Sequence, residues 1–98
     1  MRKKAPLDAL FPEIRAGVLS ATLLQPERWW FMSELARHLG TTPSSLQREL
    51  ESLAAVGLLE RRLDGRRSYF KANPDSPLFA NLRGLMEKAS GGVPTLKP

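Results

Sequence analysis

The apolar residues of the chain fall into short runs whose spacing predicts alternating helices and strands. Residues 12–24 predict a helix, and four apolar residues in and just before it fall on one face at helical spacing: Leu10, Ile14, Val18 and Ala21. Leu19 and Leu23 fall on nearly the opposite face, so this helix is apolar on two sides. The aromatic run from Trp29 to Met32 follows and predicts one brief strand.

Two short helices separated by a tight turn are predicted next. Ser33 suits an N-cap with Glu34 in the first turn, and Gly40 suits the end of this helix. Thr42-Pro43 then opens a second helix, whose apolar stripe consists of Leu46, Leu50 and Leu53 and whose end Gly57 marks. Two helices joined by so short a link must cross steeply, which is the geometry of a helix-turn-helix unit.

A hairpin and a last helix complete the pattern. Residues 58–63 and 67–72 predict two strands around Asp64-Gly65-Arg66, where Asp-Gly supplies the positive-φ positions of a tight turn. Ser76-Pro77 suits the start of a helix with the apolar stripe Leu78, Leu82, Leu85 and Ala89, with Phe79 and Met86 alongside. The predicted class is α+β, mostly helical, with a small antiparallel β wing and a C-terminal helix.

Length and composition fit one domain. We expect a basic arm over residues 1–9, a domain over residues 10–89 and a tail over residues 90–98. No apolar run approaches the roughly 18 residues that a membrane span needs, and the N-terminus lacks the features of a secretory signal. We therefore expect a cytoplasmic protein with no membrane partner.

Residue types exclude several kinds of chemistry. The chain has no cysteine and a single histidine, His38, so we expect no disulfide, no thiolate chemistry, no metal site and no cofactor. A glycine-rich phosphate loop and a paired acidic motif are also absent, and we expect that the protein is not an enzyme. We interpret His38, and the aromatic residues Trp29, Trp30 and Phe31, as packing residues in preference to ligands or base-stacking groups.

The order of predicted elements and three local segments resemble a known family. These segments are Leu35-Ala36 with Leu39-Gly40 in the tight turn, residues 46–50 in the helix that follows, and Gly57-Leu58-Leu59 before the hairpin. Over residues 12–89 the sequence resembles the ArsR-type bacterial repressors and their MarR-like relatives. The resemblance implies a winged helix-turn-helix fold and binding to double-stranded DNA. It does not imply metal response, because the cysteine pair and the ligand cluster of the metal-sensing members are missing.

The predicted DNA contacts follow from this fold. The helix after the tight turn would enter the major groove, and the hairpin would lie over the phosphate backbone. A net charge of +5 favours a polyanionic partner. In the major groove Arg48 suits guanine and Gln47 suits adenine, whereas Glu51 would repel phosphate and is expected at the edge of the contact. The candidate DNA-binding residues are Thr42, Ser44, Ser45, Gln47, Arg48, Ser52, Arg61, Arg62, Arg66 and Arg67.

The apolar faces of the first and last helices have two explanations, which are packing within the chain and a dimer seam. We favour a homodimer, with an interface made of Leu19, Leu23, Leu78, Phe79, Leu82, Leu85 and Met86. The leading hypothesis is a homodimeric, sequence-specific transcription regulator acting as a repressor, with an unidentified small-molecule or protein effector. The alternatives are a protein-interaction module with this fold and a regulatory domain of a nucleotidyltransferase system, since residues 77–79 and 82–85 resemble a helix-turn-helix segment that precedes such enzymes.

Overall fold

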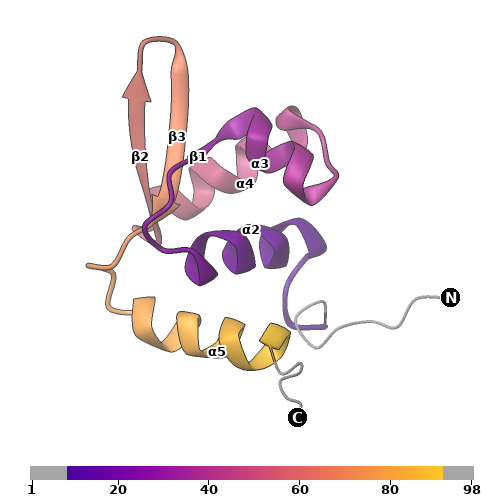
Figure 1. Ribbon diagram of the computed structural model, residues 1–98, viewed down its shortest axis with the longest axis vertical. Helices are drawn as coiled ribbons and strands as arrows, with labels where there is room; N and C mark the ends of the chain where they lie inside the picture. The colour runs from indigo at the N-terminus through magenta and orange to yellow at the C-terminus, as the bar shows by residue number, and fades with distance from the viewer. Residues whose placement is uncertain (1–8, 92–98) are drawn as a thin grey trace, which may run out of the picture.

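The computed structural model describes residues 9–91. Its elements follow the order α2 (Glu13–Leu24), β1 (Trp30–Phe31), α3 (Met32–Leu39), α4 (Pro43–Ala55), β2 (Leu59–Asp64), β3 (Arg67–Ala72) and α5 (Phe79–Gly91). The β2–β3 hairpin projects from one end of the helical body, and α5 lies at the other end, below α2 (Figure 1). The predicted order of elements and the α+β class are therefore confirmed.

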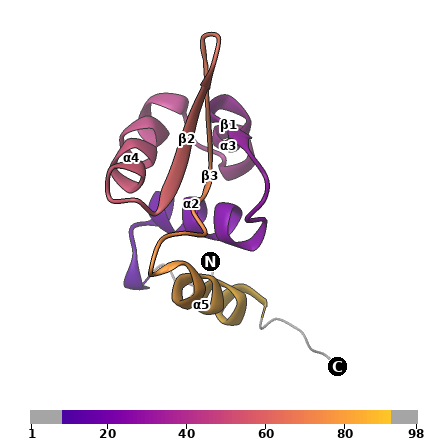
Figure 2. The ribbon, with the colours of Figure 1, turned by 90° about the vertical axis from the view of Figure 1, so that its left-hand side faces the viewer.

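The three strands form one antiparallel sheet in the order β1-β3-β2. Trp30 pairs with Phe70 across β1 and β3, and Arg62 pairs with Tyr69 across β2 and β3. Gly65, with a φ of 66°, turns the chain between the two long strands. The hairpin extends well beyond the helices in the second view as well (Figure 2). Its outer half is therefore held by strand pairing and turn geometry, without a core around it.

The hydrophobic core lies between α2, the α3–α4 pair and the base of the sheet. Val18, Leu35, Leu46 and Leu50 are completely buried there, and Phe70 enters from the sheet. Helix α2 contacts α3 and α4 on one side and α5 on another, which confirms that it is apolar on two sides. Burial of side chains of this size stabilises the fold by about 1.5–3 kcal/mol each, so α4 is firmly attached to the body.

The ends of α3 and α4 show which capping predictions hold. Helix α3 begins after Phe31, and the prediction that Ser33 is its N-cap is wrong, because the Oε1 atom of Glu34 accepts the Phe31 N–H at 3.3 Å. This reach places Glu34 three positions into the helix and shortens the predicted aromatic strand to Trp30–Phe31. Gly40, with a φ of 71°, ends α3, and the Thr42 Oγ1 atom accepts the Ser45 N–H at 3.2 Å at the start of α4, as predicted.

Helix α5 begins later than predicted. The Oγ atom of Ser76 accepts the Leu78 N–H at 3.2 Å, and the carbonyl of Ser76 accepts the Phe79 N–H at 3.0 Å, so a turn precedes the helix. Leu78 therefore lies in this turn and is 50% exposed. Within residues 9–91, each helix is too short or too polar to cross a membrane. The predicted arm and tail fall almost entirely outside the described residues.

Candidate nucleic-acid interface

Helix α4 presents a polar face to solvent because its opposite face is anchored in the core. Leu46 and Leu50 are completely buried and Leu53 is 5% exposed. At 100° per residue, the far side of the helix carries exposed polar side chains, which are Ser44, Gln47, Arg48, Glu51 and Ser52. These five residues form the exposed face of α4. The structure places the predicted helix residues where a ligand can reach them, while the DNA contacts themselves stay a prediction.

Three hydroxyl groups gather at the first turn of α4. The Thr42 Oγ1 atom caps the helix and donates to the Ser45 Oγ atom at 3.0 Å, and it lies 3.3 Å from the Ser44 Oγ atom. Thr42 is thus engaged in holding the helix start, and Ser45 is bonded to it. Backbone N–H groups at such a helix start favour negatively charged groups, among them phosphate.

The polar and charged side chains of α4 differ in whether they have a partner within the chain. The Gln47 Nε2 atom donates to the Glu51 Oε2 atom at 3.1 Å, one turn later on the same exposed face. Glu49 is 15% exposed and pairs with the Arg15 Nε atom of α2 at 2.5 Å, which ties α4 to α2. Among the described residues Arg48 forms no ion pair, so its guanidinium is available to a ligand. Sequence reasoning missed Arg15, because the pairing spans two helices distant in sequence.

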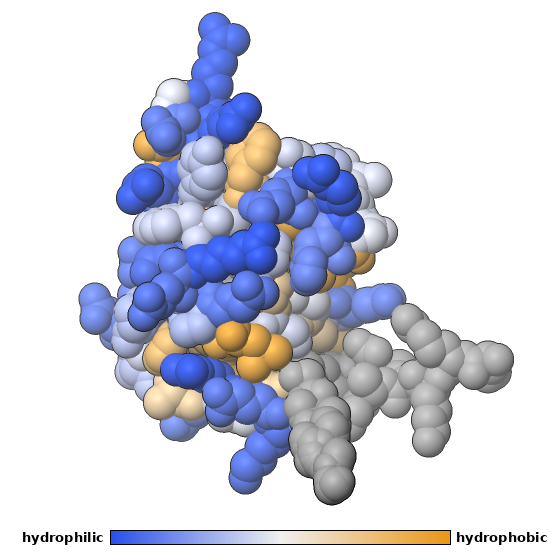
Figure 3. Space-filling model, viewed as in Figure 1, coloured by the Kyte–Doolittle hydropathy of each residue, from blue (hydrophilic) through white to orange (hydrophobic). Residues whose placement is uncertain are grey.

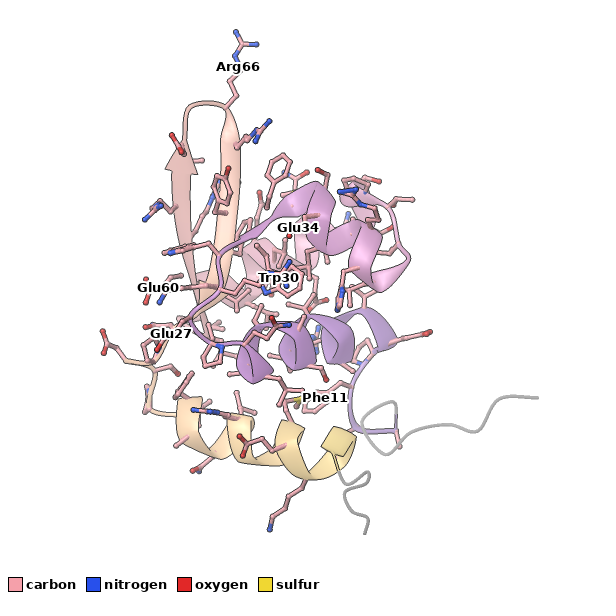
Figure 4. The ribbon with its side chains drawn as sticks, viewed as in Figure 1. Phe11, Glu27, Trp30, Glu34, Glu60 and Arg66 are labelled. Carbon is pink, nitrogen blue, oxygen red and sulfur yellow. The ribbon has the colours of Figure 1, made fainter. Side chains whose placement is uncertain are left out.

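The hairpin carries the four predicted arginines, all exposed: Arg61, Arg62, Arg66 and Arg67. Arg66 points away from the body at the tip (Figure 4), and the projecting hairpin end is strongly hydrophilic (Figure 3). The Arg62 guanidinium lies 4.8 Å from the Trp29 ring centroid, and that of Arg67 lies 4.8 Å from the Phe31 ring centroid. Such cation–π contacts are attractive, so they hold the two guanidinium groups beside these rings.

A cleft joins the hairpin to the start of α4. It has a volume of about 240 Å³ and is lined by Phe31, Met32, Ser33, Pro43, Arg66 and Ser68. Pro43 is the first residue of α4 and Arg66 is the tip of the hairpin. The first residue of α4 and the tip of the hairpin therefore border one hollow of the surface, although they are separated in sequence. Of the predicted DNA-binding residues, Arg66 lines it.

The aromatic run divides between the two sides of the sheet. Trp30 is 1% exposed and packs on the core side, but Trp29 and Phe31 are partly exposed on the other side, where the Phe31 ring lies 5.7 Å from that of Tyr69. The core-packing interpretation is therefore right for Trp30 and wrong for Trp29 and Phe31, because adjacent residues of a strand point to opposite faces. Exposed His38 packs its ring 5.0 Å from the Trp30 ring.

An ion pair supports the junction between β1 and α3. The Arg28 Nη2 atom lies 2.5 Å from the Glu34 Oε2 atom, and the Arg28 guanidinium also stacks 3.6 Å from the centroid of the Trp30 ring. The hydrogen bond from Arg28, together with the Phe31 N–H, lowers the pKa of Glu34 below its usual value. Within residues 9–91 no three potential metal-ligating side chains gather at one place.

The predicted dimer residues fall into two groups. Leu19 and Leu23 are 3% exposed and Met86 is completely buried within a single chain. Their assignment to a dimer seam is corrected to the alternative, packing within the chain, because they are buried in the core of a single chain in which α2 contacts α5. The other four lie at the edge of α5, where Leu78 is exposed and the rest are half-buried: Phe79, Leu82 and Leu85.

Comparison with known proteins relates this fold to solved structures. No protein-family model matches the sequence, and no curated protein matches it either. Reduced HlyU from Vibrio cholerae is 22% identical, with a TM-score of 0.66 and coverage of 84% of this chain and 81% of that chain. NolR from Sinorhizobium fredii is 25% identical, with a TM-score of 0.56 and coverage of 93% and 98%.

A third solved structure is also similar to this chain. It is the homodimeric winged helix-turn-helix DNA-binding domain of a possible ArsR-family transcriptional regulator from Mycobacterium bovis, 21% identical, with a TM-score of 0.53 and coverage of 95% of this chain and 92% of that chain. The resemblance inferred from the sequence is thus confirmed at the level of architecture. This chain has the winged helix-turn-helix fold, and its structure is similar to that of this possible ArsR-family regulator.

Proposed function

We propose that this protein binds double-stranded DNA and regulates transcription. The observation that carries the proposal is the cleft shared by the start of α4 and the tip of the hairpin, lined by Pro43 and Arg66. The exposed face of α4 has the dimensions and polarity that the major groove admits, and the arginine-rich hairpin suits the phosphates beside it. One duplex lying across this cleft would touch both elements.

The two elements would make different contacts with the duplex. Ser44, Gln47 and Arg48 would face base edges, and Ser45 and Ser52 would flank them, while Thr42 would hold the helix start. The hairpin arginines would pair with phosphate or enter the minor groove: Arg61, Arg62, Arg66 and Arg67. The protein would thus act by binding, and repression would follow where its site overlaps a promoter.

The proposal includes a homodimer. The edge of α5 keeps Leu78 half-exposed beside partly buried Leu82 and Leu85, and a second copy of this edge would cover them. The Mycobacterium bovis domain with this fold is a homodimer. Two copies would place two α4 helices about one DNA turn apart, so the bound site would be nearly palindromic. We also propose that the protein is cytoplasmic and responds to an unidentified small-molecule or protein effector.

The DNA proposal is tested by fluorescence-anisotropy titration of a random-sequence duplex at several salt concentrations. We expect salt-sensitive binding. We also expect Arg66→Ala/Arg67→Ala to weaken it and to reduce the log–log salt slope by about 0.9 for each phosphate that the variant no longer neutralises. Arg83→Ala/Lys88→Ala removes two cations from α5 and should leave the slope nearly unchanged. An absence of binding even at low salt would favour the protein-interaction module instead.

The homodimer is tested by sedimentation equilibrium of Leu78→Asp. We expect this variant to be monomeric at concentrations where the wild type is dimeric, because a carboxylate would be buried at the seam. Leu63→Asp is the matched control, since Leu63 is 64% exposed on the hairpin, away from α5. Identical masses for the wild type and Leu78→Asp would contradict this interface.

A further inference from the structure

Glu51 is expected at the edge of the DNA contact, but it lies among the residues that would face DNA. It lies on the exposed face of α4, one turn after Gln47 and three residues after Arg48. The other carboxylate of α4, Glu49, is turned toward the body and paired with Arg15. Among the described residues Glu51 has no cation within ion-pair distance, so its negative charge remains on the surface that would face DNA.

A carboxylate in the major groove accepts hydrogen bonds and cannot donate them. The donors on base edges there are the N4 amino group of cytosine and the N6 amino group of adenine, whereas guanine and thymine present acceptors. Adenine also carries the acceptor N7 next to its amino group, and this atom would repel a second acceptor. An ionised glutamate therefore favours cytosine over the other three bases at the position that it reaches.

The bond from Gln47 holds this carboxylate in place. The Gln47 Nε2 atom donates to the Oε2 atom of Glu51 at 3.1 Å. The Oε1 atom of Glu51 and the remaining lone pairs stay available as acceptors. Gln47 thereby directs Glu51 along the exposed face of α4, and it keeps a second N–H and its own oxygen for a neighbouring base.

We propose that Glu51 is a specificity-determining residue that selects cytosine at one position of each half-site, and that Gln47 is its positioning residue. The proposal rests on the proposed binding of double-stranded DNA. The charge that opposes DNA binding in general is here the feature that distinguishes one base from the other three.

The test is selection of bound duplexes from a randomised pool, followed by sequencing, for wild type, Glu51→Ala and Glu51→Gln. We expect a cytosine position in the wild-type site, with a preference of roughly 5- to 150-fold over other bases. Glu51→Ala should lose the preference at that position alone, and Glu51→Gln should shift it toward adenine, which suits a glutamine amide. Both variants should bind random duplex more tightly than the wild type.

Two further variants separate a reading role from a merely structural one. Gln47→Ala should weaken the cytosine preference without abolishing it, since the carboxylate remains but is less well directed. Glu27→Gln removes the same charge from the exposed loop between α2 and β1 and should leave the selected site unchanged (Figure 4). An identical selected site for wild type and Glu51→Ala would overturn this proposal while leaving DNA binding intact. A wild type that binds no duplex in the salt titration would overturn the proposed function itself.

Discussion

The start of α4 and the tip of the β2–β3 hairpin border one cleft, but the two elements differ in anchoring and charge. Three leucines hold α4 in the core, whereas Leu63 near the hairpin tip is 64% exposed. Helix α4 carries one arginine against two glutamates, whereas residues 59–72 carry five cations against two carboxylates. A rigid, nearly neutral helix suits recognition of base edges, and a projecting cationic hairpin suits attraction of phosphates. For the proposed binding to DNA, we therefore expect selectivity and affinity to reside in separate elements.

The largest expected difference concerns anchoring. Leu50→Ala should lower the free energy of unfolding by about 2–5 kcal/mol, because it leaves a cavity beneath α4. Leu63→Ala should change it by less than about 0.5 kcal/mol, since this side chain is already in water. Urea denaturation measures both. A cost for Leu63→Ala as large as that for Leu50→Ala would show that the hairpin is packed against a surface.

A smaller effect on stability is expected at the N-cap of α4. Thr42→Ala should cost about 1 kcal/mol of stability, because it removes the hydroxyl that accepts the Ser45 N–H at the start of α4. It should also weaken binding to a selected site more than binding to random duplex. Ser52→Ala, on the same helix, is the control for loss of an exposed hydroxyl. Equal unfolding midpoints for Thr42→Ala and Ser52→Ala would contradict the role of this cap.

The smallest expected effect on stability lies at the junction of β1 and α3, where β1 contacts the hairpin strand β3 and α3 contacts α4. The pKa of Glu34 is lowered in the folded protein, chiefly by Arg28, so this pair stabilises the fold above the ordinary glutamate pKa. The contribution is lost as the pH falls through the lowered pKa. Because both side chains are well exposed, we expect less than about 1 kcal/mol. Thermal unfolding of wild type and Glu34→Gln should therefore differ at pH 7, and the difference should disappear as the pH falls through the lowered pKa of Glu34.

Much of this fold could be predicted because its signals are local. The leucine stripe of α4, Thr42 and Gly40 each act through neighbours within one or two turns, and the structure bears them out. The start of α3 was misplaced because Ser33 and the reaching Glu34 are both good capping residues, and only backbone geometry chooses between them. The exposure of Trp29 and Phe31 could not be predicted, because the sequence does not show which side of the sheet faces the core.

In the candidate site too, local features could be predicted from the sequence, whereas contacts between distant elements could not. The exposure of Arg48 and Arg66 follows from periodicity and turn position, so the sequence was sufficient to place them on the surface. The Arg15–Glu49 pair and the packing of α2 against α5 depend on contacts between elements far apart along the chain. Such contacts leave no pattern in one sequence. They decide which charges of α4 remain for a ligand and which apolar residues remain for a second copy.

The central claim, that the hairpin supplies affinity and α4 supplies selectivity, is tested by one crossed measurement. Fluorescence anisotropy would give the affinity of wild type, Arg66→Ala/Arg67→Ala and Ser44→Ala/Arg48→Ala for a selected site and for random duplex. We predict that the affinity of the hairpin variant falls by a similar factor on both duplexes, whereas the helix variant binds only the selected site much more weakly. A hairpin variant without selectivity, together with a helix variant that keeps it, would contradict the claim.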